Sequence, residues 1–232
     1  MATRPKPSGM LLPMRVWDQA TRLFHWALTL LLITSYVSIS LADGKQAALW
    51  MKVHILSGEA ILALLLFRIL WGLFGSDTAR FVTFLRGPTA VWRHVAHFRL
   101  REPDRQVGHN AAGGWIVLAL LALIGVQVGT GLGANDDGSS EGPLAHFLAK
   151  PTSDLLSLLH GINFTVLAGF AGLHVLAVIG YKLFKGHDLL RPMITGKKRL
   201  PAATPAPRMA SPLLAVLAFS LAAGVTVVIS RL

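Results

Sequence analysis

The apolar residues of this sequence are gathered into five long blocks, which short polar and charged segments separate. The blocks run approximately over residues 23–41, 54–74, 114–133, 158–183 and 212–230. Each approaches the roughly 20 residues with which an α-helix crosses the hydrocarbon core of a bilayer. Apolar residues fill these blocks and do not form the one-sided stripe of a soluble amphipathic helix. The pattern predicts an all-α transmembrane fold with five spans.

The fifth block stands apart from the other four, behind a basic segment that contains several prolines. We therefore expect a cytoplasmic N-terminal tail (1–14), a four-helix transmembrane domain (15–199), a proline-rich linker (200–211) and an additional transmembrane helix (212–232). The first block has full spanning length, so we expect a retained span and not a cleaved signal peptide.

Composition agrees with a membrane protein and narrows the choice of partners. Hydrophobic residues make up 53% of the 232 residues and charged residues only 14%, whereas soluble domains carry about 25% charged residues. The net charge of +11 raises the question of nucleic acid. Nucleic-acid binding proteins gather their basic residues on one soluble face, but here these residues lie between the apolar blocks. We expect contact with membrane lipid and no binding of nucleic acid.

The placement of lysine and arginine predicts the orientation in the membrane. With a cytoplasmic N-terminus, all but four of the 22 lysines and arginines fall on the cytoplasmic side. The four exceptions are Lys45, Lys52, Lys150 and Arg231. Because cytoplasmic loops carry an excess of these residues, we expect a multi-pass protein of the bacterial inner membrane with its N-terminus inside and its C-terminus in the periplasm.

Four of the nine histidines lie in or at the edge of the apolar blocks, namely His25, His54, His160 and His174. An ionisable group at membrane depth is costly, which makes such a histidine a functional candidate. The alternative is a histidine that only hydrogen-bonds between helices. The sequence contains no cysteine, which excludes thiolate-bound iron–sulfur clusters and covalently attached c-type haem.

The spacing of these histidines separates them into two levels. His160 and His174 are 14 residues apart on one predicted helix, which places them about 21 Å apart and on nearly the same face. The predicted topology pairs His174 with His25 on the inner side and His160 with His54 on the outer side. Ligands this far apart cannot converge on one zinc ion, whereas haem iron takes two axial imidazoles from facing helices. We expect two non-covalent b-type haems.

The surroundings of the two levels contain four further candidates. Arg22 and Arg68 are cations available near the inner surface, and Glu59 is the only acidic residue clearly within a span. His109 directly precedes the third span. We consider Arg22, Arg68, Glu59 and His109 as candidates for the environment of the haems or of a quinone. His94, His97, His146 and His187 lie in predicted loops, where solvated histidines are common.

Several segments together resemble one known family. They are VWDQATRLFHW (16–26), HILSGEAILALLLFRILWGLFGSDTARF (54–81), GHNAAGG (108–114) and GHDLLRPMITGKKR (186–199), with the spacing of His160 and His174. They resemble the bacterial cytochrome b561 family, which includes the b-type cytochrome subunit of nickel–iron hydrogenases. The resemblance implies a four-helix core that binds two b haems through His25, His54, His160 and His174. The fifth helix departs from the small four-helix members.

The resemblance also implies a function. Family members pass electrons between a quinone pool and a partner redox protein, such as a hydrogenase or a c-type cytochrome. Some small relatives act alone as superoxide:ubiquinone oxidoreductases, so both an electron-transfer subunit and a quinone-linked enzyme fit. A non-redox transporter or scaffold, in which the histidines only bond helices, is the alternative from another class.

Overall fold

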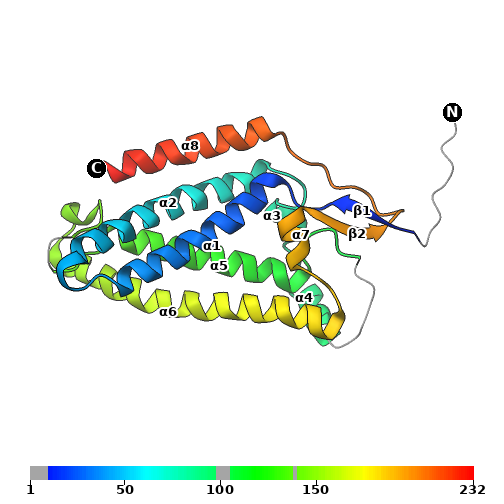
Figure 1. The fold of residues 1–232 in the computed structure, drawn as a ribbon, viewed down its shortest axis with the longest axis horizontal. Coiled ribbons are helices and arrows are strands. Elements are labelled where there is room, and N and C mark those ends of the chain that lie inside the picture. The colour runs from blue at the N-terminus through cyan, green and yellow to red at the C-terminus, as the bar shows by residue number, and fades with distance from the viewer. Residues whose placement is uncertain (1–9, 98–104, 138–139) are drawn as a thin grey trace.

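Five long helices lie side by side and account for most of the fold (Figure 1). The computed structural model describes residues 10–97, 105–137 and 140–232, so residues 1–9 of the expected N-terminal tail lie outside the described part. The long helices are α1 (Gln19–Ser40), α2 (Ala47–Phe74), α5 (Ala111–Leu132), α6 (Lys150–Gly180) and α8 (Pro212–Ser230). Each is long and apolar enough to cross a membrane, which confirms the predicted all-α fold with five spans.

Polar caps explain why three of these helices begin where they do. Asp18 caps α1 by accepting a hydrogen bond from the Thr21 N–H at 2.6 Å. Asn110 caps α5 by accepting one from the Gly113 N–H at 2.7 Å, and Ser211 caps α8. A capping side chain satisfies backbone N–H groups that the first turn leaves unpaired. The caps of α1 and α5 lie before the apolar blocks, so both helices start earlier than hydropathy predicted.

The four core helices pack as two layers. Helix α1 packs on α2, α5 packs on α6, and α2 also contacts α5, while α8 lies along the other side of α2. Buried aliphatic residues from α2, α5 and α6 form the centre of the bundle, namely Ile61, Leu62, Leu65, Ile124, Val128 and Leu167. A second cluster, with Phe24, Phe67, Trp71 and Ala222, joins α8 to α1 and α2.

Short elements connect the long helices. They are the helices α3 (Phe81–Phe84), α4 (Pro88–Ala96) and α7 (Leu190–Thr195), the 3₁₀ turns η1 (Gly44–Gln46) and η2 (Ala145–Phe147), and the π-helical turn η3 (Tyr181–Lys185) that extends α6. Gly186 ends this turn with a φ of 73°. Glycine adopts this left-handed conformation without steric cost.

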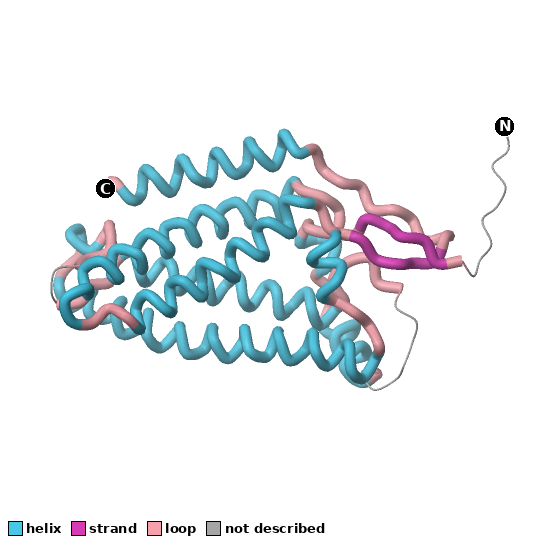
Figure 2. The backbone as a smooth tube through the Cα atoms, viewed as in Figure 1, coloured by secondary structure: helices cyan, strands magenta, loops and turns pink. Residues whose placement is uncertain are grey.

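Two strands, which the apolar pattern did not indicate, join the two ends of the core domain. Strand β1 (Leu11–Arg15) pairs antiparallel with β2 (Lys197–Pro201), as Figure 2 shows beside the helical bundle. Pro13 lacks an N–H group, and such a residue is tolerated because both strands of a two-stranded sheet are edge strands. Val16 and Leu200 are buried together at the base of this sheet.

The fifth helix is fixed to the core through the segment before it. The Asp77 N–H donates to the Arg208 carbonyl at 3.0 Å, and the Asp77 carboxylate accepts the Arg208 N–H at 2.8 Å. The Ala210 N–H donates to the Ser76 hydroxyl at 2.9 Å. These bonds join the end of α2 to the start of α8 and hold the two helices antiparallel (Figure 1).

Candidate functional site

The four membrane histidines form two pairs, and α6 contributes one member to each. The ring centres of His54 (α2) and His160 (α6) are 6.1 Å apart. Those of His25 (α1) and His174 (α6) are 6.4 Å apart. We call them the outer pair and the inner pair, after the sides of the membrane that the charge distribution predicts. The structure therefore brings together the same partners that helix topology paired.

Hydrogen bonds fix the orientation of both rings in the outer pair. The Nδ1 atom of His54 lies 3.0 Å from the carbonyl oxygen of Ser35. The Nδ1 atom of His160 lies 2.9 Å from the Gln127 carbonyl and 3.2 Å from the Thr130 hydroxyl. Because a carbonyl oxygen accepts only, each Nδ1 carries the proton. The Nε2 atom of each ring then has a free lone pair, as in metal-binding histidines that donate through their other nitrogen.

A cavity of about 380 Å³ adjoins the outer pair, and both histidines line it. This volume falls in the range of roughly 300–1,000 Å³ that is common for small-molecule and cofactor sites. Gly58 and Gly161 contribute no side chain to its wall, and Glu59 also lines it. The outer pair thus faces a space that a cofactor can enter, with Glu59 among the residues that surround it.

Helix α5 approaches His160 very closely at Gly131. A β-carbon at this position would lie 2.9 Å from the Cε1 atom of the His160 ring and 3.2 Å from its Nδ1. Real β-carbons do not approach a neighbour to within 3.0 Å. Glycine is therefore required here for the ring to occupy its position between α5 and α6.

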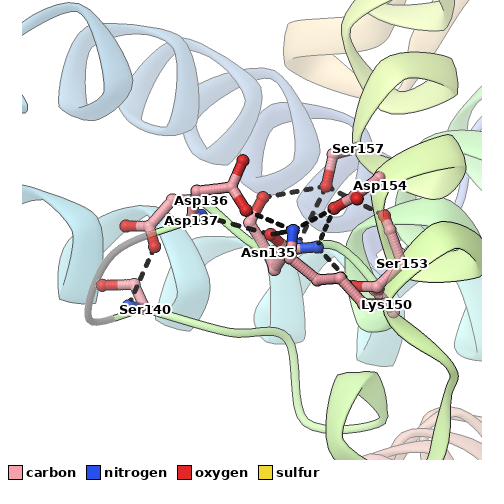
Figure 3. A network of polar contacts seen from close by, with 9 residues as sticks. Asn135, Asp136, Asp137, Ser140, Lys150, Ser153, Asp154 and Ser157 are labelled. Carbon is pink, nitrogen blue, oxygen red and sulfur yellow. Dashed lines mark hydrogen bonds and ion pairs between the residues drawn. The ribbon is translucent and has the colours of Figure 1, made fainter.

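A polar network joins the connection between α5 and α6 to the start of α6 (Figure 3). Two of its residues, Asn135 and Ser157, also line the cavity. The Ser157 hydroxyl donates to the Asn135 carbonyl at 2.8 Å and accepts the Asn135 N–H at 2.9 Å. Lys150 forms ion pairs with Asp137 and Asp154. Except for the ion pair between Lys150 and Asp154, these contacts join residues of the connection to residues of α6 that are 13 to 22 positions away in the sequence.

The inner pair has different surroundings. The His25 Nδ1 atom is buried and has no hydrogen-bond partner among the described residues, and the Trp26 ring stands at 84° to the His25 ring. The Arg22 Nη1 donates to the Ile194 carbonyl at 2.5 Å, and the Trp26 Nε1 donates to the Met193 carbonyl at 3.2 Å. Helix α7 thus fixes the start of α1, and with it the height of His25.

Arg68 and His109 lie near the inner pair. Arg68 is only 3% exposed, and its guanidinium lies 4.9 Å from the centre of the Phe81 ring. The His109 ring packs between Trp17, at 4.8 Å, and Phe84, at 4.7 Å. Burial, followed by the charge of Arg68, lowers the pKa of His109 to about 3. His109 is therefore neutral at physiological pH.

His94 differs from its predicted surroundings. It lies in the short helix α4 and hydrogen-bonds to the Tyr181 hydroxyl, which also accepts a bond from the Asn110 Nδ2 at 2.9 Å. This cluster links α4, α5 and the end of α6. The amphipathic composition of residues 88–96 was the signal that could have predicted the helix.

The spacing of each histidine pair fits an iron-bound cofactor. Imidazole nitrogen binds a metal at about 2 Å, so two rings on opposite sides of one metal have centres about 6.3 Å apart. The two pairs lie close to this value, at 6.1 Å and 6.4 Å. In the described part of the chain, no three residues among His, Cys, Asp and Glu are grouped so that they could hold a metal ion. The separation of the rings in each pair is therefore the feature that fits a haem iron held between two histidines.

Comparison with known proteins gives a family and a curated relative. Residues 16–196 match the family described as prokaryotic cytochrome b561. The "Probable Ni/Fe-hydrogenase B-type cytochrome subunit" of Bradyrhizobium diazoefficiens is 21% identical over 210 residues, covering 79% of this chain and 85% of the relative. No solved structure matches the chain. Since the family match spans most of the chain, with five membrane helices, the chain belongs to the prokaryotic cytochrome b561 family and is a multi-pass membrane b-type cytochrome of electron transfer.

Proposed function

We propose that this chain is a di-haem electron carrier of the bacterial inner membrane, which passes electrons between a quinone pool and a partner redox protein. The observation that carries the proposal is that α6 contributes one histidine to each of two pairs, whose ring centres are 6.1 and 6.4 Å apart. One pair alone would serve a single centre. Two pairs at different depths provide a route across the bilayer, whose hydrocarbon core is about 30 Å thick.

Each pair would hold the iron of one b haem. We assign His54 and His160 as the outer ligands, because their Nδ1–H bonds to Ser35 and Gln127 leave each Nε2 lone pair available for a metal. His25 and His174 are the inner ligands. A haem held at each pair would supply a one-electron redox centre.

The apolar layer between the pairs supports transfer of electrons without transfer of water. Leu167 lies midway along α6 between His160 and His174, and it packs with Ile61 and Ile124 in the centre of the bundle. Side chains of this kind exclude water and keep the local dielectric low. They also fix the separation of α2, α5 and α6, which in turn fixes the positions of the ligand rings.

The orientation proposed for the chain places the inner pair near the cytoplasm. The end of the bundle with Arg68, Arg80 and β2 carries most of the basic residues, and the positive-inside rule assigns this end to the cytoplasmic side. The N-terminus then lies in the cytoplasm and the C-terminus, after α8, in the periplasm.

The proposed partners are a redox protein and a quinone. The relative from Bradyrhizobium is named as a hydrogenase cytochrome subunit, which favours a hydrogenase-like partner, with a c-type cytochrome as the other choice. Glu59 lines the outer cavity and no hydrogen bond to its carboxylate is found among the described residues. A carboxylate at that depth is suited to accept a proton from a quinol.

Reduction in lipid vesicles tests this function. The purified chain is reconstituted anaerobically, and decylubiquinol is added while the b-type absorbance bands are followed. We expect quinol to reduce the haem in the wild type. Reduction by dithionite but not by quinol would contradict the quinone role. If superoxide, generated enzymatically, reduces the haem in the absence of any partner, the stand-alone superoxide:ubiquinone oxidoreductase gains over the electron-transfer subunit.

A further inference from the structure

Arg68 is a buried cation whose charge is incompletely balanced within the described structure. Its side chain is 3% exposed, and its Nη1 has no hydrogen-bond partner among the described residues. The nearby carboxylate of Asp18 already accepts bonds from the Thr21 N–H and hydroxyl and from the Trp71 Nε1. Burying a charge without a hydrogen-bonded counter-ion is strongly unfavourable. The site of Arg68 therefore requires an additional anionic acceptor.

Other unsatisfied polar atoms lie around the inner pair. The Nδ1 atoms of His25 and His109 and the Nε of Arg22 are buried without a partner in the described part of the chain. His109 lies close enough to Arg68, His174 and His25 for their charges to interact. Nearly all buried polar groups in native proteins have a partner. Several unpartnered atoms in one place indicate that a ligand with acceptor atoms completes the site.

We propose that Arg68, with His109 beside it, binds a carboxylate of the haem that His25 and His174 hold. The inference rests on the proposed function, because it needs a haem at the inner pair. Haem carries two propionate carboxylates, and the guanidinium of arginine binds a carboxylate through two parallel, charge-assisted hydrogen bonds. A neutral acceptor, such as a quinone carbonyl, would satisfy the hydrogen bond but leave the buried charge unbalanced.

A cation bound to the haem carboxylate would also change the reduction potential of the haem. Reduction adds one negative charge to the haem, and a fixed cation in a low-dielectric site stabilises the reduced form. Arg68 is thus a positioning residue that also raises the reduction potential of the inner haem. Because Arg68 lies at the inner end of α2, the outer haem is not expected to respond.

Potentiometric titration of Arg68→Gln tests the inference. To isolate the inner haem, the substitution is also made together with His160→Ala, which removes an outer ligand. We expect the reduction potential of the inner haem to fall by at least about 59 mV in both the single and the double variant. For a one-electron couple this corresponds to a tenfold smaller equilibrium constant for reduction. The matched control is Arg80→Gln, since Arg80 lies at the same end of the bundle but pairs with Asp77.

The possible outcomes separate this inference from the proposed function. Two haems with unchanged potentials in Arg68→Gln would overturn the inference alone, as would a shift confined to the outer component. Absence of haem from the wild type would overturn the proposed function. If Arg68→Gln does not fold, His109→Leu serves instead, because it keeps the buried charge. In His109→Leu, a fall in the reduction potential of the inner haem that is smaller than about 59 mV supports the inference. An unchanged reduction potential of the inner haem overturns it.

Discussion

The Cα atom of Gly131 faces the ring of His160 so closely that a β-carbon there would lie 2.9 Å from the ring's Cε1. The ring cannot turn away freely, because its Nδ1 is bonded to the Gln127 carbonyl. Gly131→Ala is therefore expected to displace the ring and to lower occupancy of the outer haem. Overpacking of this kind costs about 1–3 kcal/mol.

Haem-to-protein ratios and thermal unfolding of the two glycine variants measure this effect. The control is Gly129→Ala, on the same helix, where a β-carbon would meet nothing within 4 Å. We expect Gly129→Ala to keep the wild-type haem content. Equal haem content in both variants would show that the ring position does not matter for cofactor binding.

The pairing of the histidines predicts which variants lose the same haem component from the absorbance spectrum. His25→Ala and His174→Ala should each lose the same haem component, since their rings face each other at 6.4 Å. His54→Ala and His160→Ala should lose the other component. Reduced-minus-oxidised spectra at low temperature distinguish the two. His146→Ala, in the exposed turn η2, is the control and should keep both components. Loss of one component by both His25→Ala and His160→Ala would refute the pairing.

The network between the α5–α6 connection and α6 predicts a loss of stability in Ser157→Ala. The Ser157 hydroxyl both donates to and accepts from the Asn135 backbone, so its removal leaves two groups without their partner. A lost hydrogen bond of this kind costs about 1–3 kcal/mol, and in a chain of this size each kcal/mol lowers the melting temperature by about 2–4 °C.

Thermal unfolding of Ser157→Ala is compared with that of Ser40→Ala. The Ser40 hydroxyl donates to the Tyr36 carbonyl of its own helix, and its removal should leave the melting temperature nearly unchanged. An identical melting temperature for Ser157→Ala and the wild type would mean that the connection between α5 and α6 does not depend on this bond.

Docking of the fifth helix is expected to weaken in acid. The backbone N–H of Arg208, and then the charge of Arg80, lower the pKa of Asp77 below its usual value, which is about 3.9. A group with a lowered folded-state pKa stabilises the fold above the unfolded pKa, and this contribution is lost as the pH falls through the folded pKa. The contact between Asp77 and Arg208 should therefore have constant strength from neutral pH to about pH 5 and weaken below about pH 4.

The rate of limited proteolysis in the linker before α8 measures how firmly this contact holds the helix. The linker of the Asp77→Asn variant should be cleaved faster than that of the wild type at neutral pH. Its cleavage rate should also depend much less on acid pH. Asp43→Asn, at the opposite end of the bundle where Asp43 caps η1, should behave as the wild type. Cleavage rates that do not change with Asp77→Asn would show that other contacts hold α8 in place.

The parts of the molecule that sequence could predict are those that depend on local pattern. Hydropathy over about 20 residues indicated the five helices, and the rotation of an α-helix placed His160 and His174 on one face. The two pairs could then be matched by depth alone. The same reasoning could not locate the strands β1 and β2, because their pairing joins the two ends of the core domain and depends on no local signal.

The surroundings of the pairs were harder to predict for the same reason. Arg68 could be named as a cation near the inner surface, but its burial under Phe81 depends on how α3 folds back on α2. The close approach of Gly131 to His160 depends on the packing of α5 against α6. A run of glycines indicates close helix packing in general and does not say which glycine a ligand ring will contact.

The number of haems per chain tests the central claim most directly. Haem b is extracted from the purified protein and quantified as its pyridine complex, and the protein is quantified by amino-acid analysis. The two histidine pairs predict two haems b per chain, both reducible and both lost when His160 and His174 are replaced together. A ratio of one or of zero would contradict the di-haem account.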